Sequence, residues 1–368
     1  MVAMSEQFPE EFDPTVRAID EVRQTMDGQT TTGAPETAMA SGPPPEDIVA
    51  EKKRLGIPIK VSEAPPAVRR SVIDDMSRLR VLAAEILPSN DQGVDMQRID
   101  AFFTRRGLAV QPATILTPEA LRYYLQRLKE LGFTSKSLEE LGRHTERDVT
   151  PLASYEQRLG RIIALRPPGR LSPLEIFKLN YNIAHEKAHS TAGKPVEDMV
   201  YTEDDVRMMR ECFFERSGLA NVTTGEGIFL EEGESERQAA KYAREELNMP
   251  GGFWPVADPS ISPSALASIG GNEQVPLVYL QPSEAGSQAG MTIGALPAYG
   301  LELLMREAPE LEAALESNRP FDEHAEQITG IINGISPGLG DELLRIDRPT
   351  PGQFNEGLRL IKRRLGYS

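Results

Sequence analysis

Apolar residues in this chain recur mostly at the three- and four-residue spacing of an α-helix. The run 66–86 is one example, with apolar side chains at Val68, Val72, Ile73, Met76, Leu79, Leu82 and Ile86. A second helix is predicted to begin after Thr117, which suits an N-cap, with Pro118 at the first helical position and an end near Gly132. We therefore expect residues 46–166 to fold as consecutive helices.

A clear helix start follows a break in the pattern at 166–170, where the sequence is R-P-P-G-R. Ser172 is the predicted N-cap, Pro173 takes the first helical position, and Glu175 completes a capping box. Gly193 is predicted to end this helix.

The rest of the chain has further helical patterns and few strand signals. Helices are predicted at about 202–217, 228–247, 294–306, 309–317, 322–333 and 350–365. The region 249–292 is rich in Pro, Gly and Ser, and it contains one strand-like run, Val275–Leu280. The expected fold class is therefore mainly α, with little sheet.

Charge is spread unevenly along the 368 residues, whose net charge is −16. Residues 1–50 contain 2 basic and 10 acidic side chains, residues 51–170 contain 21 and 15, and residues 171–368 contain 17 and 31. The stretch before residue 45 has few large apolar groups, so it cannot offset the entropic cost of ordering. We therefore predict a disordered acidic tail (1–45), a basic helical domain (46–167) and a third domain (168–368).

Composition also argues against several classes of protein. A single cysteine, Cys212, excludes a disulfide framework and a cysteine-based metal cluster within one chain. The acidic N-terminal residues have no apolar core, so no signal peptide is expected. No run of about 18 apolar residues occurs, so no membrane span is expected. These features predict a cytoplasmic protein in a reducing compartment.

Two of the four histidines lie in one short string, 185–189, which reads H-E-K-A-H and has the form H-E-x-x-H. On a helix, His185 and His189 lie on the same face, so both imidazoles can hold one zinc ion. Glu186 between them can act on a water at the metal. The string lies on the helix that begins at Pro173, which is the context that this motif requires.

A catalytic zinc ion usually takes three protein ligands, so a third is expected. Neither His144 nor His324 has motif context, and Cys212 lies among apolar neighbours that favour burial. The better candidate is the acidic run 229–236, in which Glu232 and Glu236 share a helix face with small and apolar residues. Carboxylates on such a face need a cation or a hydrogen-bond partner.

Together the two strings resemble the active-site motifs of the gluzincin metallopeptidases, of which thermolysin and the alanyl aminopeptidases are examples. The resemblance covers about residues 175–245 and implies a zincin-like catalytic domain over 168–368. It implies Zn²⁺ bound by His185, His189 and Glu232. It also implies that Glu236 accepts a hydrogen bond from a ligand histidine, which we expect to be His185.

The same resemblance implies hydrolysis of a peptide or protein substrate, with Glu186 as the general base. Gluzincins commonly use a downstream tyrosine or histidine to stabilise the oxyanion. Tyr299 and His324 are the candidates here, although single residues without a motif are more often structural.

Two other functions stay open. Lys187 puts a charge beside the general base, which favours a metallopeptidase fold that no longer cleaves and serves as a binding module. The excess of basic residues in 51–170 allows nucleic-acid binding through residues 46–167. An ordinary helical domain with a mildly basic surface accounts for the same charge. The oligomeric state is not specified by any of these features.

Overall fold

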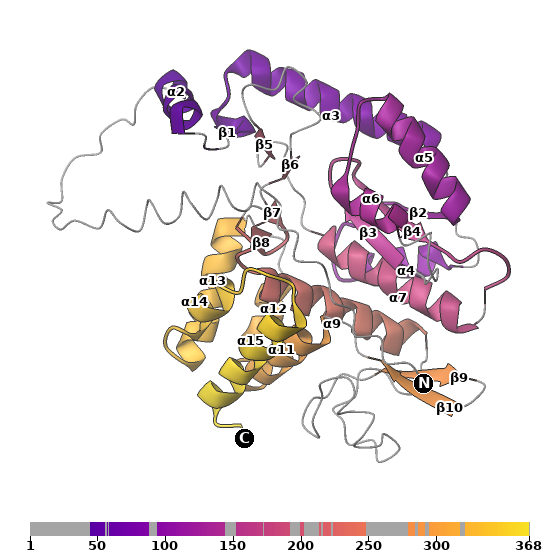
Figure 1. The fold of residues 1–368 in the computed structure, drawn as a ribbon. Helices are drawn as coiled ribbons and strands as arrows, with labels where there is room; N and C mark the ends of the chain where they lie inside the picture. Colours follow the sequence, from indigo (N-terminus) through magenta and orange to yellow (C-terminus); the bar gives the residue numbers. More distant parts are fainter. Residues whose placement is uncertain are drawn as a thin grey trace, which may run out of the picture. The chain divides into compact units, whose positions relative to one another are not determined.

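The computed structural model describes residues 45–55, 57, 59–87, 94–143, 152–171, 173–191, 199–201, 213–214, 216–221, 224–247, 279–283, 286–290, 294–316 and 321–367. Within these ranges the protein is mainly helical, which confirms the expected class (Figure 1). The predicted tail lies outside the described residues apart from Pro45. His144, Ser172, Gly193 and Cys212 also lie outside them.

Five helices belong to the segment predicted as a basic helical domain, with a short 3₁₀ turn, η2 (Val61–Glu63), after the first. They are α2 (Pro45–Leu55), α3 (Pro66–Ile86), α4 (Met96–Thr104), α5 (Pro118–Glu130) and α6 (Lys136–Arg143). The Thr117 hydroxyl accepts the backbone N–H of Ala120, so the predicted start of α5 is confirmed. The Asp95 carboxylate caps α4 in the same way through the N–H of Arg98.

The expectation of consecutive helices over 46–166 is wrong at four strands, the two-residue β1 (Ile59–Lys60) and three longer ones. The longer strands are β2 (Ala113–Leu116), β3 (Leu152–Glu156) and β4 (Arg161–Leu165), which form a sheet in the order β2-β4-β3. Strand β2 runs parallel to β4, and β3 runs antiparallel to it with Tyr155 opposite Ile162. Strands β2 and β4 are buried along their whole length, so their sequences lack the polar alternation that reveals a half-buried strand.

The remaining strands are short. One sheet joins β1 (Ile59–Lys60), β5 (Met199–Tyr201) and β6 (Phe213–Phe214), and two hairpins pair β7 (Arg216–Ser217) with β8 (Ala220–Asn221) and β9 (Tyr279–Ser283) with β10 (Gly286–Gly290). The helix predicted at 202–217 is therefore wrong over β6 and β7, and residues 202–212 lie outside the described residues. The strand predicted at 275–280 overlaps β9 only in its last two residues.

Seven helices are found among the described residues that follow the Arg166–Arg170 break. They are α7 (Pro173–His189), α9 (Ile228–Glu246), α11 (Ala295–Glu307), α12 (Glu310–Leu315), α13 (Phe321–Ile335), α14 (Leu339–Leu344) and α15 (Pro351–Leu365). All except the short α14 match predicted helices. None of the described helices combines the length and apolar character needed to span a bilayer.

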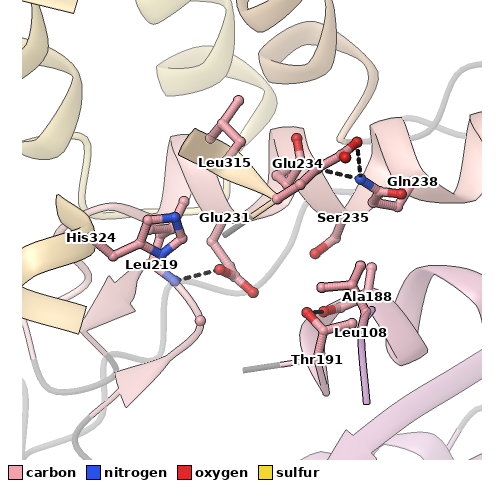
Figure 2. Close-up of a pocket in the computed structure, with 12 residues that line it drawn as sticks. Leu108, Ala188, Thr191, Leu219, Glu231, Glu234, Ser235, Gln238, Leu315 and His324 are labelled. Carbon is pink, nitrogen blue, oxygen red and sulfur yellow. Dashed lines mark hydrogen bonds between the residues drawn. The ribbon is translucent and has the colours of Figure 1, made fainter. Parts of the chain in front are cut away.

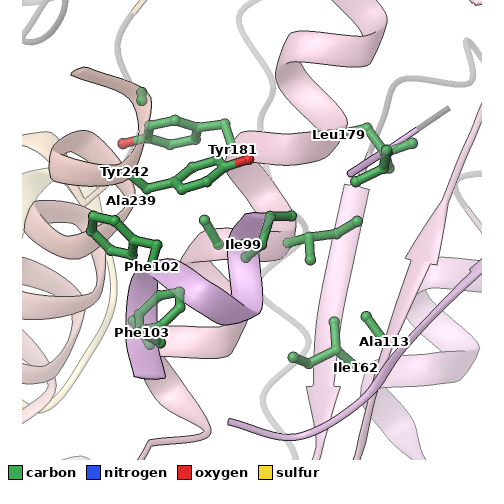
Figure 3. Packing of buried hydrophobic residues seen from close by; sticks show 14 of the residues in the cluster. Ile99, Phe102, Phe103, Ala113, Ile162, Leu179, Tyr181, Ala239 and Tyr242 are labelled. Carbon is green, nitrogen blue, oxygen red and sulfur yellow. The ribbon is translucent and has the colours of Figure 1, made fainter. Parts of the chain in front are cut away.

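One hydrophobic cluster joins the segments before and after residue 167. Ile99, Phe102 and Phe103 of α4 pack with residues of the sheet, of α7 and of α9 (Figure 3). The Phe102 ring meets the ring of Tyr242 on α9 edge-on, with centroids 5.5 Å apart. Helix α7 thus packs between the sheet and α9 (Figure 1). The described parts on both sides of residue 167 share this core, and the boundary itself stays a prediction.

A second cluster forms on the other side of α9. It is built by α11 to α15, with Phe229 of α9 at its centre and the Phe354 ring 5.9 Å from it. Helix α9 is therefore buried on two sides, and three of its carboxylates, those of Glu231, Glu232 and Glu236, contact histidines of α7.

Candidate metal centre

Three ligand atoms converge where α7 packs against α9. The Nε2 atoms of His185 and His189 lie 3.0 Å apart. The Glu232 carboxylate offers Oε2 at 3.5 Å from His185 Nε2 and Oε1 at 3.7 Å from His189 Nε2. Tetrahedral zinc, with ligands at roughly 2.0–2.1 Å, separates its ligand atoms by roughly 3.4 Å. The donor set therefore fits one zinc ion in both chemistry and spacing. It is the one group of three such side chains within the described residues.

Local geometry explains why these atoms meet. The four-residue spacing puts His185 and His189 on one face of α7. On α9, Gly233 directly follows the carboxylate ligand and lets α11 approach. A Cβ on Gly233 would lie 2.9 Å from the carbonyl carbon of Pro297 and 2.9 Å from Leu301 Cδ1. A side chain at position 233 would therefore come too close to the backbone of α11, and glycine avoids this.

His185 is supported from behind by Glu236. Glu236 Oε2 lies 3.0 Å from His185 Nδ1, and the Tyr181 hydroxyl donates a hydrogen bond of 2.8 Å to Glu236 Oε1. The Glu236 side chain is only 2% exposed. A buried carboxylate on Nδ1 turns Nε2 toward the ligand triangle and favours the tautomer that binds a metal there. This is the geometry that the sequence led us to expect for Glu236.

His189 has an equivalent partner that the sequence motifs did not single out. Glu231 Oε1 lies 2.7 Å from His189 Nδ1, and Ser235 Oγ lies 3.0 Å from the same atom. Glu231 Oε2 accepts the backbone N–H of Leu219. Gly218, with φ +58°, leaves the room for this contact, because a Cβ there would lie 1.8 Å from Glu231 Oε2. The sequence contains a signal for this support of His189. Glu231 and Ser235 are four residues apart, so on a helix they share a face next to the predicted ligand Glu232.

The carboxylates control the protonation of both imidazoles. Burial lowers the pKa of His185, but its hydrogen bonds with Glu232 and Glu236 outweigh burial and hold that pKa well above the ordinary value. Burial also lowers the pKa of His189, and the contact with Glu231 again leaves it raised. Burial alone would raise the pKa of Glu232, but the two imidazoles lower it to about 2. In the absence of a metal ion, the positive charge of the protonated imidazoles balances the negative charge of the carboxylates around them.

Glu186 lies on α7 beside the ligand triangle and is held by the sheet. Its Oε2 accepts the backbone N–H of Tyr155 on β3 at 2.8 Å. Burial raises the pKa of Glu186, the charges of the two histidines oppose this shift, and the nearby Glu232 adds to it. A carboxyl with a raised pKa is a better proton acceptor than an ordinary glutamate, which suits general acid–base chemistry.

Lys187 does not point toward the ligand triangle. Its ammonium lies 2.6 Å from Asp100 Oδ1 on α4 and donates a hydrogen bond of 2.9 Å to the carbonyl oxygen of Gln111. The side chain is 1% exposed. Residues two apart on a helix do not share a face, so the charge that sequence alone places beside the general base is directed away from His185 and His189.

The structure does not bring Tyr299 or His324 into contact with the ligand triangle. Tyr299 packs half-buried between the two hydrophobic clusters, and none of its described contacts reaches His185 or Glu232. Burial raises its pKa. The Nε2–H of His324 donates a 2.6 Å hydrogen bond to the carbonyl oxygen of Ala314. Their roles at an oxyanion stay predictions without support from a described contact.

His324 instead lines a cavity of about 50 Å³ behind His189. Figure 2 shows His324, Glu231 and Ser235 around this cavity. Its lining contains the groups that hold His189 Nδ1, but it contains neither His185, Glu186 nor Glu232. The cavity is large enough for a water molecule. It therefore belongs to the support of His189 rather than to the face where the ligand atoms converge.

No family model, no curated protein and no solved structure matches the chain. The function is therefore inferred from the arrangement of α7, α9 and the residues that support them.

Proposed function

We propose that the protein is a zinc-dependent metallopeptidase that hydrolyses peptide bonds at a zincin-like site. The observation that carries the proposal is the convergence of His185 Nε2, His189 Nε2 and the Glu232 carboxylate at ligand spacing. A zinc ion held there supplies a Lewis acid that polarises a substrate carbonyl and lowers the pKa of a water molecule to roughly 7.

The other residues have roles that follow from their contacts. The Tyr155 N–H holds Glu186 Oε2, which fixes the direction of the carboxylate and leaves Oε1 to hold a proton. In the proposed reaction Glu186 takes a proton from the attacking water and passes it to the leaving amine. Glu231 and Glu236 hold the imidazoles in one orientation, so the site needs little rearrangement to accept the ion.

The first test is the metal content of the purified full-length chain beside that of Glu186→Gln. We expect about one zinc per chain in both, because Glu186 is a proposed base and not a ligand. We expect the wild type to cleave a quenched-fluorescence peptide library and Glu186→Gln to lose at least about a hundredfold in rate. Glu175→Gln, in the first turn of the same helix, is the matched control and should cleave like the wild type.

Two results separate this proposal from its rivals. Folded wild-type protein without zinc, and with no affinity for added zinc, would remove the metallopeptidase proposal. Stoichiometric zinc without cleavage of any peptide would instead identify the binding module. This module is less strongly supported because Lys187 is buried and its ammonium lies against Asp100 and the carbonyl oxygen of Gln111 rather than beside Glu186.

The nucleic-acid alternative is weakened by ion pairs between α4 and α9. Arg98 and Arg105 both pair with Glu246, and Arg106 pairs with Glu245. Part of the positive charge of residues 51–170 is therefore compensated by α9. This alternative predicts salt-sensitive binding of DNA or RNA to the full chain, and the lack of binding at low salt would end it.

A further inference from the structure

Helix α4 lies in the segment before the H-E-x-x-H string, yet it contacts both helices that carry the ligand triangle. Toward α7, its Asp100 Oδ1 lies 2.6 Å from the buried ammonium of Lys187. Toward α9, Arg98 Nε lies 3.1 Å from Glu246 Oε2, and Arg106 Nη2 lies 2.7 Å from Glu245 Oε2. The Phe102 ring of α4 also packs edge-on against the Tyr242 ring of α9 (Figure 3). Helix α4 therefore links α7 to α9 on the side away from the ligands.

The link to α7 is made at Lys187, which lies in the helical turn that carries both imidazoles. Lys187 lies midway between His185 and His189, on the opposite side of the helix. Its ammonium has two anchors, Asp100 Oδ1 and the carbonyl oxygen of Gln111. The N–H of Gln111 also donates to Ser190 Oγ at 3.1 Å, directly after the last turn of α7. Both contacts hold the end of α7 against the segment 100–111.

Rotation of this turn would move both imidazoles away from Glu232. Such a rotation requires the Lys187 ammonium to leave its partners while it stays in a position that is 1% exposed. A buried charge without its partner is strongly unfavourable, so the anchors resist the rotation. From the other side, the carboxylates of α9 hold the two imidazoles of the same turn, and the Tyr155 N–H of β3 holds Glu186.

We infer that Lys187 is a positioning residue for the metal centre, and that α4 acts through it to keep His185 and His189 aimed at Glu232. This inference rests on the proposed zinc site. It assigns to the charged residue inside the H-E-x-x-H string a role in metal geometry, and it adds Asp100 and Gln111 to the residues that support the metal centre. A side chain that only stabilised the fold would leave the geometry of the ligands unchanged.

The test compares zinc affinity and Co²⁺ absorption in three variants of the full-length chain. Lys187→Met keeps the apolar stem and removes the ammonium. Asp100→Asn removes the partner charge at a side chain that is 48% exposed, so it tests the same link if Lys187→Met does not fold. Lys241→Met is the matched control, because Lys241 on α9 makes ion pairs with Glu312 of α12 and with Glu316, the residue after this helix, instead of with α4.

We expect Lys187→Met to weaken zinc binding about tenfold to a hundredfold, measured by competition with a chromogenic chelator. The visible absorption of its Co²⁺ form should shift, because the ligand geometry changes. Asp100→Asn should change the zinc affinity and the Co²⁺ absorption in the same direction as Lys187→Met, but by a smaller amount. Lys241→Met should leave the zinc affinity and the Co²⁺ absorption at the wild-type values. Wild-type affinity and an unchanged Co²⁺ spectrum in Lys187→Met and Asp100→Asn would overturn the inference alone. A wild type that binds neither ion would overturn the proposed function as well.

Discussion

Glu231 Oε1 lies 2.7 Å from His189 Nδ1, and this contact gives the second imidazole of the H-E-x-x-H string its own buried carboxylate. Glu236 does the same for His185. The two Nε2 atoms consequently face each other and Glu232 at the spacing of zinc ligands. A metal-binding histidine usually has such a partner, which fixes its tautomer and makes it a better ligand. Both imidazoles are thus oriented by buried carboxylates, that of Glu231 directly before Glu232 and that of Glu236 four residues after it.

Replacing Glu231 should weaken metal binding without removing a ligand. Glu231→Gln keeps the shape of the side chain but loses the charge that orients His189. We expect the dissociation constant for zinc to rise about tenfold, measured by chelator competition. Glu226→Gln, at an exposed position just before α9, should leave it unchanged. Equal zinc affinity in Glu231→Gln and the wild type would show that the contact does not support His189.

Zinc should stabilise the folded chain. The ligands come from two helices that meet only in the folded state, so the ion binds the native form and not the unfolded one. With free zinc at roughly 100 times its dissociation constant, the free energy of unfolding should rise by about 2.7 kcal/mol. Urea titrations with and without zinc measure this gain. Glu232→Ala should lose most of it, and an equal gain in that variant would argue that zinc binds elsewhere.

The metal-free protein should lose stability as the pH rises above neutral. The pKa values of His185 and His189 are raised because their carboxylate contacts outweigh burial. Each protonated imidazole then contributes stability that is complete below the unfolded pKa of about 6.5. This contribution is lost as the pH rises through the raised folded value. Urea unfolding from about pH 6 to about pH 9 should show this decline.

Zinc should remove that pH dependence, because it binds the neutral imidazoles and replaces their protons.

The stability that Glu232 contributes depends on pH in the opposite direction, because the pKa of this carboxyl is lowered to about 2. Its contribution is present above its ordinary pKa and is lost as the pH falls through the lowered value. A metal-free protein whose stability rises between neutral and alkaline pH would contradict the assigned protonation of the histidines.

Gly233 should not tolerate a side chain. The Cβ of Gly233→Ala would lie 2.9 Å from the backbone of Pro297, which cannot move without displacing α11. We expect a loss of about 1–3 kcal/mol in the free energy of unfolding. Gly334→Ala, on α13 with open space around the added methyl, is the control and should be neutral or stabilising by about 0.5–1 kcal/mol. Thermal unfolding of both variants tests the contact, and an undisturbed Gly233→Ala would refute it.

Features that depend on neighbours along the chain can be predicted from the sequence. The start of α5 follows from a threonine cap and a proline, and helices α7 and α9 follow from local spacing and turn residues. Because residues four apart share a helix face, the pairing of His185 with His189 is also local. The strands β2 and β4 escape such a prediction because a fully buried strand shows no alternation of polar and apolar residues.

The partners of these side chains come from distant parts of the chain, and only packing decides them. Asp100 reaches Lys187 from 87 positions away, and Glu231 reaches His189 across 42. Nothing in the spacing of the string tells whether Lys187 faces the ligands or the core, because that depends on which side of α7 the sheet and α4 cover. Local patterns determine which atoms can bind a metal, while long-range contacts determine whether those atoms are turned toward one point in space.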